Sequence, residues 1–546
     1  MPNQLVITVA PKTRAEMGVG IRLYRLLSRW GRRRLTCVLL IAVFTFGFRL
    51  ALTPVLPHPQ PAGHDEFAYL LGADLLAHGR VAEPAHPLWK FFESVHVLSR
   101  PVYAPKYPPA QSAFLALGQV VFNDPFYGVL LSVALFAAAV CWMLQIYVGP
   151  AWALLGGICT ALYFGAGHYW TERYWGGAVT GLGAALLVGA FGRLMQWRNP
   201  YFGAAFGAGA LLLAASRPYE SSILILFLCA SLTVSFWRKR RLLQTRMVAP
   251  AVLSLSAAFF VLLGYNHAVT GNALKMPYVL HLQQYASAPP FWFMPALQPK
   301  RYENPGIQHA YEDAEKPEYK EVSTQSPAGS VGRNLLTILV TIIYDGGVFG
   351  LAPLMFIPLL WRDSTIRFYT WCAVLLTAAL VVETYMSLHY AAPLLVVGTL
   401  LSCLILDRLW KIRRTKCADR ILLACVLSVL LLAGPVWRAV RAMEGVTGKL
   451  YPDSGFGLQR AQVVQTIMNH PGNHVVFVHY TPQQSPYVTW VANGADIDSS
   501  RLIWAHDRGG ENRELQEYFK DRTFWSLEYK EGVVSLLPYN AATASR

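Results

Sequence analysis

Long apolar runs, repeated from one end of the sequence to the other, are what most limits how this chain can fold. Segments of about 16–23 apolar residues recur, and each is long enough to cross the hydrocarbon core of a bilayer as a helix. Hydrophobic residues make up 54 % of the chain and charged residues only 14 %, whereas soluble domains carry about 25 % charged residues. We therefore predict a polytopic α-helical membrane protein with about eleven spans. The predicted spans lie near residues 36–56, 126–147, 150–167, 176–194, 202–216, 219–236, 248–265, 346–361, 367–383, 390–407 and 420–437.

The placement of Lys and Arg predicts which loops face the cytoplasm. Residues 1–35 carry eight basic residues and a single acid, Glu16. Alternate loops further along the chain are also basic, and cytoplasmic loops are enriched in Lys and Arg. These loops read RLMQWRNP, WRKRRLLQTRM, WRDSTIR and DRLWKIRRTKCADR. We predict a cytoplasmic N-terminus and an outer C-terminus, and the net charge of +16 then requires no nucleic acid as a partner.

The same pattern divides the chain into three parts. A basic cytoplasmic N-terminus covers residues 1–35, and a transmembrane domain covers residues 36–440. Two large loops of this domain, 57–125 and 266–345, fall on the outer side of the membrane. Residues 441–546 are less apolar, and we predict that they form a small α/β domain outside the membrane.

The two later outer regions differ in their expected order. In the C-terminal part, HVVFVHY, SRLIWAH and TFWSLEY have the character of buried strands, and ENRELQEYFKDR has that of a helix. In the second outer loop, residues 304–330 are rich in Glu, Lys, Pro and Ser, so we expect an irregular segment there.

The first outer loop opens with the sequence HDEFAYLLGADLLAHG, which predicts a helix. Asp65 or His64 can cap its start, and Gly79 can end it, since glycine enters the left-handed conformation at little cost. Apolar residues recur at helical spacing, so we expect an amphipathic helix that lies on the membrane surface. The apolar stripe consists of Phe67, Leu71 and Leu75.

Two adjacent carboxylates, Asp65 and Glu66, stand at the head of this helix. A carboxylate at a membrane interface can act as a general base toward an acceptor hydroxyl, or it can bind a divalent ion. The alternative is that Asp65 only caps the helix and Glu66 faces water. A metal site made of Asp65, Glu66 and His64 stays open, although no spacing typical of structural zinc is present. No nucleotide-binding fingerprint is present, so the sequence indicates no organic cofactor.

Basic and aromatic residues in later outer segments could bind a phosphate or a sugar. Lys106, in KYPPAQ, could neutralise a phosphate, or it could be a lysine that snorkels to the interface. Arg173 and Trp175, in TERYWGG, could pair with phosphate and stack on a sugar, or belong to the aromatic belt of the membrane. His389 and Tyr390 stand at the outer end of a predicted span.

Two of these motifs resemble a known enzyme family. The pattern D-E-x-x-Y-x-x-x-A-x-x-L-x-x-x-G after the first span, with the later K-x-P-P element, resembles the first outer loop of GT-C glycosyltransferases. The likeness is greatest to the branch of protein O-mannosyltransferases and lipid A aminoarabinose transferases, and it covers roughly residues 30–410. The chain departs from the aminoarabinose branch at Pro105, where an acidic residue is usual. The matching residues are Asp65, Glu66, Tyr69, Ala73, Leu76, Gly79, Lys106, Pro108 and Pro109.

The resemblance implies a GT-C-like fold and an activity at the outer face. Such enzymes move a sugar from a polyprenyl-phosphate donor to an acceptor, with inversion at the anomeric carbon. Asp65 would then be the base or acceptor-orienting group, and Glu66 would support it or bind metal. The acceptor could be a lipid, a glycan or a protein. We expect the donor phosphate to be bound by Lys106, His389, Tyr390 and Arg173, and acceptor or sugar to be contacted by Tyr69, Tyr107 and Trp175.

Two other classes of protein compete with this interpretation. A lipid or polysaccharide transporter or flippase would place ionisable residues near the middle of its spans, whereas here they gather in the outer loops. A non-catalytic membrane anchor for the C-terminal domain would not require so many spans. We therefore expect a multi-pass enzyme of the inner membrane whose active site faces the periplasm.

Overall fold

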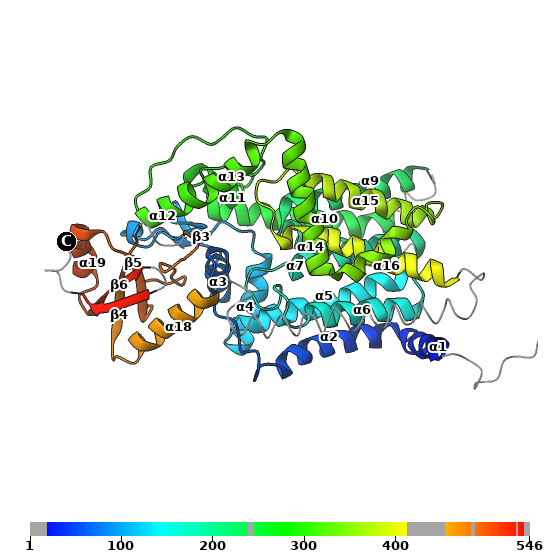
Figure 1. Ribbon diagram of the computed structural model, residues 1–546, viewed down its shortest axis with the longest axis horizontal. Coiled ribbons are helices and arrows are strands. Elements are labelled where there is room, and N and C mark those ends of the chain that lie inside the picture. Colours follow the sequence, from blue (N-terminus) through cyan, green and yellow to red (C-terminus); the bar gives the residue numbers. More distant parts are fainter. Residues whose placement is uncertain are drawn as a thin grey trace, which may run out of the picture.

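The structure is a computed structural model that describes residues 19–197, 199–238, 245–411, 454–481, 486–530 and 533–539. Figure 1 shows three parts arranged along the long axis of the molecule. A bundle of long helices lies at one end, and the C-terminal α/β domain at the other. Between them lies an outer region that contains α3 (His64–Ala77) and helices of the second outer loop.

The bundle is built from helices that correspond to the predicted spans. Six helices are long and apolar enough to cross a membrane, by length and composition. The chain is accordingly a polytopic α-helical membrane protein. Every predicted span up to residue 407 overlaps one helix of the bundle. The predicted span 420–437 lies outside the described residues. The helices are α2 (Arg34–Ala51), α5 (Phe126–Tyr147), α6 (Pro150–Phe164), α7 (Ala178–Trp197), α8 (Tyr201–Ala214), α9 (Pro218–Arg238), α10 (Thr245–Thr270), α14 (Pro327–Leu351), α15 (Ser364–Leu380) and α16 (Ala392–Lys411), with α1 (Val19–Gly31) across one end.

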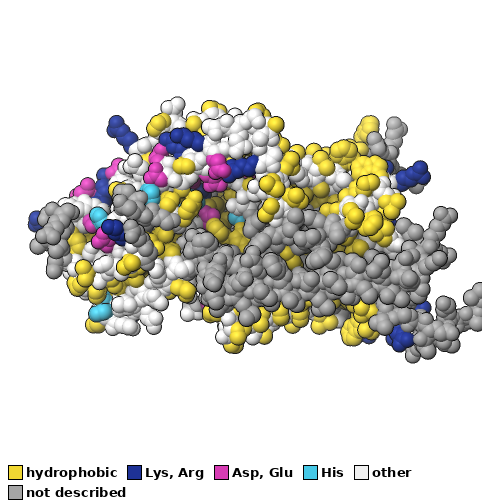
Figure 2. Space-filling view, viewed as in Figure 1, with side chains coloured by type: hydrophobic (Ala, Val, Ile, Leu, Met, Phe, Trp, Pro, Cys, Tyr) yellow, Lys and Arg dark blue, Asp and Glu magenta, His cyan; other side chains and the backbone are white. Residues whose placement is uncertain are grey.

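The surface of the molecule follows the same division. Figure 2 shows many apolar side chains on the coloured parts of the bundle, while acidic side chains gather over the outer region and the C-terminal domain. A helix such as α5, with 22 residues, is about 33 Å long at 1.5 Å per residue, which matches the hydrocarbon core of a bilayer. The charged and apolar zones therefore fit a bundle immersed in lipid with a polar head outside it.

The second outer loop is more helical than the sequence indicated. The segment 304–330, expected to be irregular, contains α12 (Pro305–His309), a π-helix η3 (Ala310–Glu315) and α13 (Lys316–Ser323). The following span also starts earlier, because Pro327 begins α14 and a proline is well suited to the first turn of a helix. The expected boundaries 266–345 and 346–361 are therefore wrong for this region. Ahead of these elements lies α11 (Pro277–Gln284), and behind α14 and α15 lie the short η4 (Ala352–Phe356) and η5 (Leu388–Ala391).

Helix α3 does not lie on the membrane surface, which corrects the sequence-based expectation. Its residues are buried on almost every side, including Phe67, Leu71 and Leu75 of the expected stripe. One side packs against α4 (Ala110–Phe122), where a Cβ on Gly72 would come within 2.5 Å of the Ser112 hydroxyl. The predicted end of the helix is confirmed, since Gly79 follows it with a φ of +72°.

A small antiparallel sheet follows α3 and positions the KYPP element. Its strands β1 (Glu83–Pro84), β2 (Val97–Leu98) and β3 (Val102–Pro105) lie in the order β1-β3-β2. The 3-10 turn η2 (Trp89–Phe91) lies between β1 and β2. Because Lys106 follows β3 directly and His96 precedes β2, the pairing of these strands brings the two residues to the same edge.

The C-terminal domain contains a four-stranded sheet in the order β5-β4-β6-β7. The three parallel strands lie at the segments where buried strands were expected, and the predicted helix is α19. Helix α18 precedes the sheet and the 3-10 turn η6 follows β5. The elements are α18 (Ser454–Met468), β4 (Asn473–His479), β5 (Leu502–His506), η6 (Gly509–Glu511), α19 (Asn512–Tyr518), β6 (Arg522–Lys530) and β7 (Val533–Pro538).

This domain also packs against α3. The backbone N–H of Ala495 donates to the Asp74 carboxylate at 2.7 Å. The Arg460 guanidinium lies 4.6 Å from the ring centroid of Phe67 and 4.7 Å from that of Trp504. Helix α3 is therefore a core element shared by the outer region and the C-terminal domain.

An ion pair ties the first span to a turn between α6 and α7. Arg49 of α2 is fully buried, and its Nε and Nη2 atoms donate to the two carboxylate oxygens of Glu172 at 2.8 and 2.7 Å. Two parallel hydrogen bonds fix the relative orientation of the two groups. The outer end of α2 is therefore attached to the turn that also contains Arg173.

We expect the substitution Glu172→Gln to destabilise the protein strongly. It leaves the buried Arg49 charge without its partner, which costs about 3–5 kcal/mol in comparable pairs. The exposed pair of Arg80 and Glu83 is the matched control, and Glu83→Gln is expected to cost less than about 1 kcal/mol. Thermal unfolding of the purified protein in detergent measures both changes. Equal melting temperatures for the two variants would contradict the structural role of the Arg49 pair.

Candidate active site

The head of α3 is held by Glu66, which fills all its hydrogen-bonding positions with protein donors. One oxygen, Oε2, accepts from the backbone N–H groups of Ala62 at 2.9 Å and Gly63 at 3.1 Å, and from Arg173 Nη1 at 3.0 Å. The other oxygen accepts from the backbone N–H of Tyr174 at 3.0 Å. Glu66 therefore caps the helix and joins it to the TERYWGG turn.

These contacts give two of the predicted site residues a structural role. Glu66 is fully buried, and both its carboxylate oxygens accept hydrogen bonds from the protein. Arg173, expected to hold a phosphate, is 5 % exposed and uses Nη1 to neutralise Glu66. We assign both residues to the positioning of α3, since a buried charge needs a partner of opposite sign.

Asp65 has one oxygen that is occupied and one that is free. Its Oδ1 atom accepts a hydrogen bond from the Tyr107 hydroxyl and lies 2.5 Å from Nδ1 of His96. Within the described residues no donor contacts Oδ2 of Asp65, and the side chain is 22 % exposed. Asp65 therefore has one carboxylate oxygen, Oδ2, available to a bound ligand.

The surroundings keep Asp65 ionised. Burial raises the pKa of its carboxyl, but the charge and hydrogen bond of His96, followed by the charge of Lys106, outweigh burial. The pKa of Asp65 therefore lies well below its usual value. A carboxylate in this state can accept a hydrogen bond from an acceptor hydroxyl.

Lys106 lies in an aromatic cage beside Asp65. Its ammonium is 5.2 Å from the ring centroid of Tyr107 and 5.4 Å from that of Tyr278. In the described part of the chain no carboxylate forms an ion pair with this ammonium. Burial lowers the pKa of Lys106 to about 8, although the charges of Glu315 and Asp65 oppose the shift. A cation held among aromatic rings without an ion pair is suited to binding an anion.

A second cation, Arg217, belongs to the same site. Its guanidinium lies 3.9 Å from the ring centroid of Tyr390, and its charge lowers the pKa of Lys106. Arg217 was not among the site residues predicted from the sequence. The signal that could have found it is its position at the outer turn between α8 and α9.

The remaining predicted aromatic residues surround these charged groups. The ring of Tyr69 stacks on that of Tyr107, with centroids 4.5 Å apart. The Tyr169 hydroxyl bonds to His389 Nδ1, and the ring of His389 stacks on Trp175 with centroids 5.8 Å apart. His389 is 3 % exposed, so we assign it to the support of the neighbouring Tyr390. Apart from Glu66 and Arg173, the predicted residues thus gather around Asp65 and Lys106.

The second outer loop contributes residues that no sequence motif indicated. Tyr278 and His281 come from α11, and Tyr311 and Glu315 come from the π-helix. The Tyr311 hydroxyl lies 2.8 Å from Nε2 of His281 and accepts from the backbone N–H of His96 at 3.3 Å. A π-turn inside a helix often marks a functional site, but it cannot be read from residue spacing.

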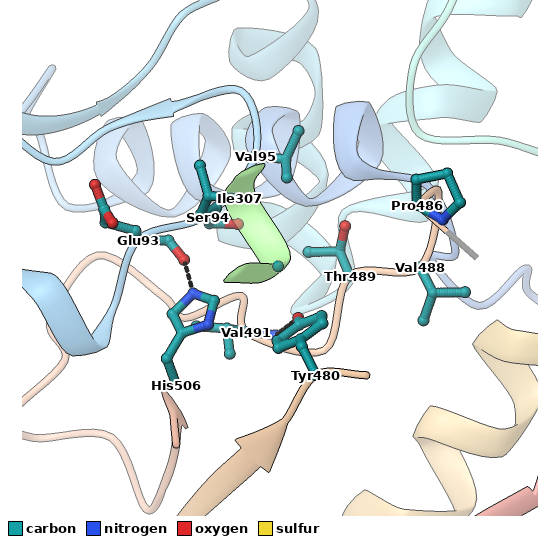
Figure 3. Close-up of a pocket in the computed structure, with 11 residues that line it drawn as sticks. Glu93, Ser94, Val95, Ile307, Tyr480, Pro486, Val488, Thr489, Val491 and His506 are labelled. Atoms are coloured by element: carbon teal, nitrogen blue, oxygen red, sulfur yellow. Dashed lines mark hydrogen bonds between the residues drawn. The ribbon is translucent and has the colours of Figure 1, made fainter. Parts of the chain in front are cut away.

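The C-terminal domain also reaches the site. His64 Nδ1 lies 2.6 Å from the Thr489 hydroxyl, and burial with the charge of His96 lowers the pKa of His64 to about 3. Figure 3 shows the adjoining pocket, where Val95, Ile307 and Thr489 bring the two outer loops and the C-terminal domain together. The dashed bond in this view joins Nε2 of His506 to the backbone carbonyl of Glu93 at 2.7 Å.

The metal site that the sequence left open at His64, Asp65 and Glu66 does not fit this geometry. Glu66 has no oxygen to spare, and His64 uses Nδ1 to contact Thr489. Among the residues that the structure describes, no group of three or more His, Cys, Asp or Glu side chains is placed to hold a metal ion. The chemistry at this site is therefore derived from the protein side chains alone.

The two neighbouring carboxylates should respond differently to substitution. Glu66→Gln places an amide NH₂ group among donors and removes the buried negative charge that faces Arg173, so we expect a loss of about 3–5 kcal/mol in the free energy of unfolding. Asp65→Asn is expected to change stability much less, because Asp65 is partly exposed and its Oδ2 has no partner to lose. Thermal unfolding of the two variants makes the comparison. A larger loss in Asp65→Asn than in Glu66→Gln would reverse the assignment.

Comparisons with known proteins found similarity among solved structures. No protein-family model matches the chain, and a search of curated proteins found no match. Among solved structures, the chain is similar to ArnT from Cupriavidus metallidurans bound to undecaprenyl phosphate, with 11 % identity, a TM-score of 0.49, and coverage of 94 % of this chain and 99 % of that one. It is also similar to the Archaeoglobus fulgidus oligosaccharyltransferase in the apo form, with 10 % identity, a TM-score of 0.48, and coverage of 94 % and 70 %.

Proposed function

We propose that this protein is an integral-membrane glycosyltransferase. It moves a sugar from a polyprenyl-phosphate donor to an acceptor hydroxyl at the outer, periplasmic face of the inner membrane, with inversion at the anomeric carbon. The observation that carries the proposal is one site in which a carboxylate with a free oxygen, Asp65, lies beside a caged ammonium, Lys106. The acceptor is a lipid, a glycan or a protein.

The cations of the site neutralise the charge of the phosphate leaving group. Phosphate leaves with the electron pair of the anomeric C–O bond, and its departure is easier when its charge is neutralised. Lys106 and Arg217 supply two positive charges, and Tyr390 lies under the Arg217 guanidinium. The Lys106 ammonium has no ion pair to break within the described residues, so donor binding displaces no protein carboxylate from it.

The Asp65 carboxylate acts as the base toward the acceptor hydroxyl. The free Oδ2 of Asp65 accepts the hydroxyl proton while the acceptor oxygen bonds to the anomeric carbon. A single displacement inverts the configuration when nucleophile and leaving group lie on opposite faces of the sugar. Asp65 on α3 and Arg217 at the α8–α9 turn come from different elements, which supports such an arrangement. The stacked rings of Tyr69 and Tyr107 offer an apolar face for the sugar.

The transfer assay tests the proposal directly. Purified protein is supplied with a panel of polyprenyl-phosphate sugars that carry a radiolabel, and Asp65→Asn is compared with wild type. We expect a loss of about 100-fold or more in Asp65→Asn, the scale of a missing general base. Asp313→Asn, which changes an exposed carboxylate of the second outer loop, is the control and should keep the wild-type rate. Binding of the donors without any transfer by wild type would contradict an enzyme and return the transporter and anchor hypotheses.

Donor binding should weaken as pH rises past about 8. Lys106 binds phosphate only when protonated, and its pKa in the free protein is about 8. Above that pH the ammonium is progressively lost, so the affinity for undecaprenyl phosphate should fall by up to about tenfold per pH unit. Lys106→Arg keeps its charge throughout, so it should bind with little pH dependence, and it corrects for ionisation of the phosphate itself. Equal pH dependence in both proteins would contradict the role of Lys106.

A further inference from the structure

His96 lies between two acidic side chains that come from different outer loops. Its Nδ1 atom is 2.5 Å from Oδ1 of Asp65 on α3, and its Nε2 atom is 3.7 Å from Oε1 of Glu315 on the π-helix. A ring nitrogen faces a carboxylate as a donor only when it carries a proton. A His96 ring that carries both protons therefore satisfies both carboxylates.

The backbone at His96 adopts a conformation that disfavours most side chains. Its φ is +67°, in the left-handed region where glycine and asparagine are usual. Two hydrogen bonds hold the residue there, because its N–H donates to the Tyr311 hydroxyl at 3.3 Å and its carbonyl accepts from the Lys106 N–H at 3.0 Å. Left-handed backbone at a residue other than glycine is typical of functional positions.

The groups that face the ring show what its charge acts on. The Tyr107 hydroxyl lies 3.1 Å from Nδ1, and the rings of His64 and His281 lie 5.4 and 5.9 Å away by their centroids. Burial and the charge of Lys106 lower the pKa of His281 well below its usual value, and His64 has a pKa of about 3, so both rings are neutral. Among the described neighbours the carboxylates at the ring are Asp65 and Glu315.

We propose that His96 is the positioning residue for Asp65, and that Glu315 holds His96 in place. The proposal rests on the proposed function. His96 and Tyr107 occupy Oδ1, so that Oδ2 is the oxygen that faces the acceptor hydroxyl. During transfer the hydroxyl proton passes to Oδ2, the acceptor oxygen bonds to the anomeric carbon, and the phosphate leaves with the electron pair of the broken C–O bond. His96 does not take part in this proton transfer.

This arrangement makes the second outer loop a condition for activity. Glu315 and Tyr311 both come from the π-helix, and they contact the side chain and the backbone of His96. Displacement of this segment would remove both contacts and release the Asp65 carboxylate. The positive ring also weakens Asp65 as a base, so the hydroxyl proton moves late, after bonding to an electron-poor anomeric carbon has begun.

The substitution His96→Asn tests the proposal, because asparagine tolerates the left-handed backbone but carries no charge. We expect the turnover rate at saturating donor to fall by about 10- to 100-fold, the scale of a misplaced catalytic group, while undecaprenyl phosphate binding is unchanged. Glu315→Gln should produce a smaller loss of the same kind. The exposed His78→Asn is the matched control and should keep the wild-type rate.

Separate measurements of turnover, donor binding and thermal stability distinguish positioning from a purely structural role. In His96→Asn the turnover rate at saturating donor should fall while donor affinity and melting temperature stay at the wild-type values. Wild-type turnover in His96→Asn would overturn the proposal. A matching loss of donor binding or of thermal stability would also overturn it, because His96 would then only support the fold. Absence of transfer by wild type would instead overturn the proposed function itself.

Discussion

The anchoring of Glu66 is the interaction on which the rest of the site depends. Its carboxylate accepts four hydrogen bonds, from the chain before α3 and from the TERYWGG turn. These contacts determine where α3 begins and therefore where the next carboxylate, Asp65, points. Adjacent acidic residues thus have separate tasks, one buried and saturated, the other partly exposed with an oxygen to spare. The two environments differ because Glu66 faces Arg173 inside the protein, whereas Asp65 faces His96 and Tyr107.

Around this anchor, segments far apart in the sequence supply groups of opposite charge. Asp65 comes from the first outer loop, Arg217 from the turn between α8 and α9, and Glu315 from the second outer loop. None of these segments could form the site alone, since each supplies one charge that would be costly to bury without the others. The bundle therefore acts as a frame that brings separate outer segments together, and the C-terminal domain completes the enclosure through Thr489.

Sequence reasoning found the parts of this molecule that depend on composition and local motif. Apolar length located the helices of the bundle, and the D-E and K-x-P-P elements located Asp65 and Lys106. It missed His96 and Glu315 because their roles arise from contacts between loops, which leave no periodic signal. It also misplaced α3 on the membrane surface, because an apolar stripe looks the same whether lipid or another domain covers it. Here Arg460 and its neighbours in the C-terminal domain provide that cover.

The TERYWGG turn contains two adjacent residues of opposite charge, and each is neutralised on a different helix. Glu172 pairs with Arg49 at the outer end of α2, and Arg173 pairs with Glu66 at the head of α3. The turn thus links two helices that are also joined covalently by residues 52–63. The connecting segment belongs to the same assembly, because the backbone N–H groups of Ala62 and Gly63 donate to Glu66 and the carbonyl of Pro59 accepts from the Tyr174 hydroxyl. A change in the length of this segment would therefore move the head of α3, and Asp65 with it, relative to the turn.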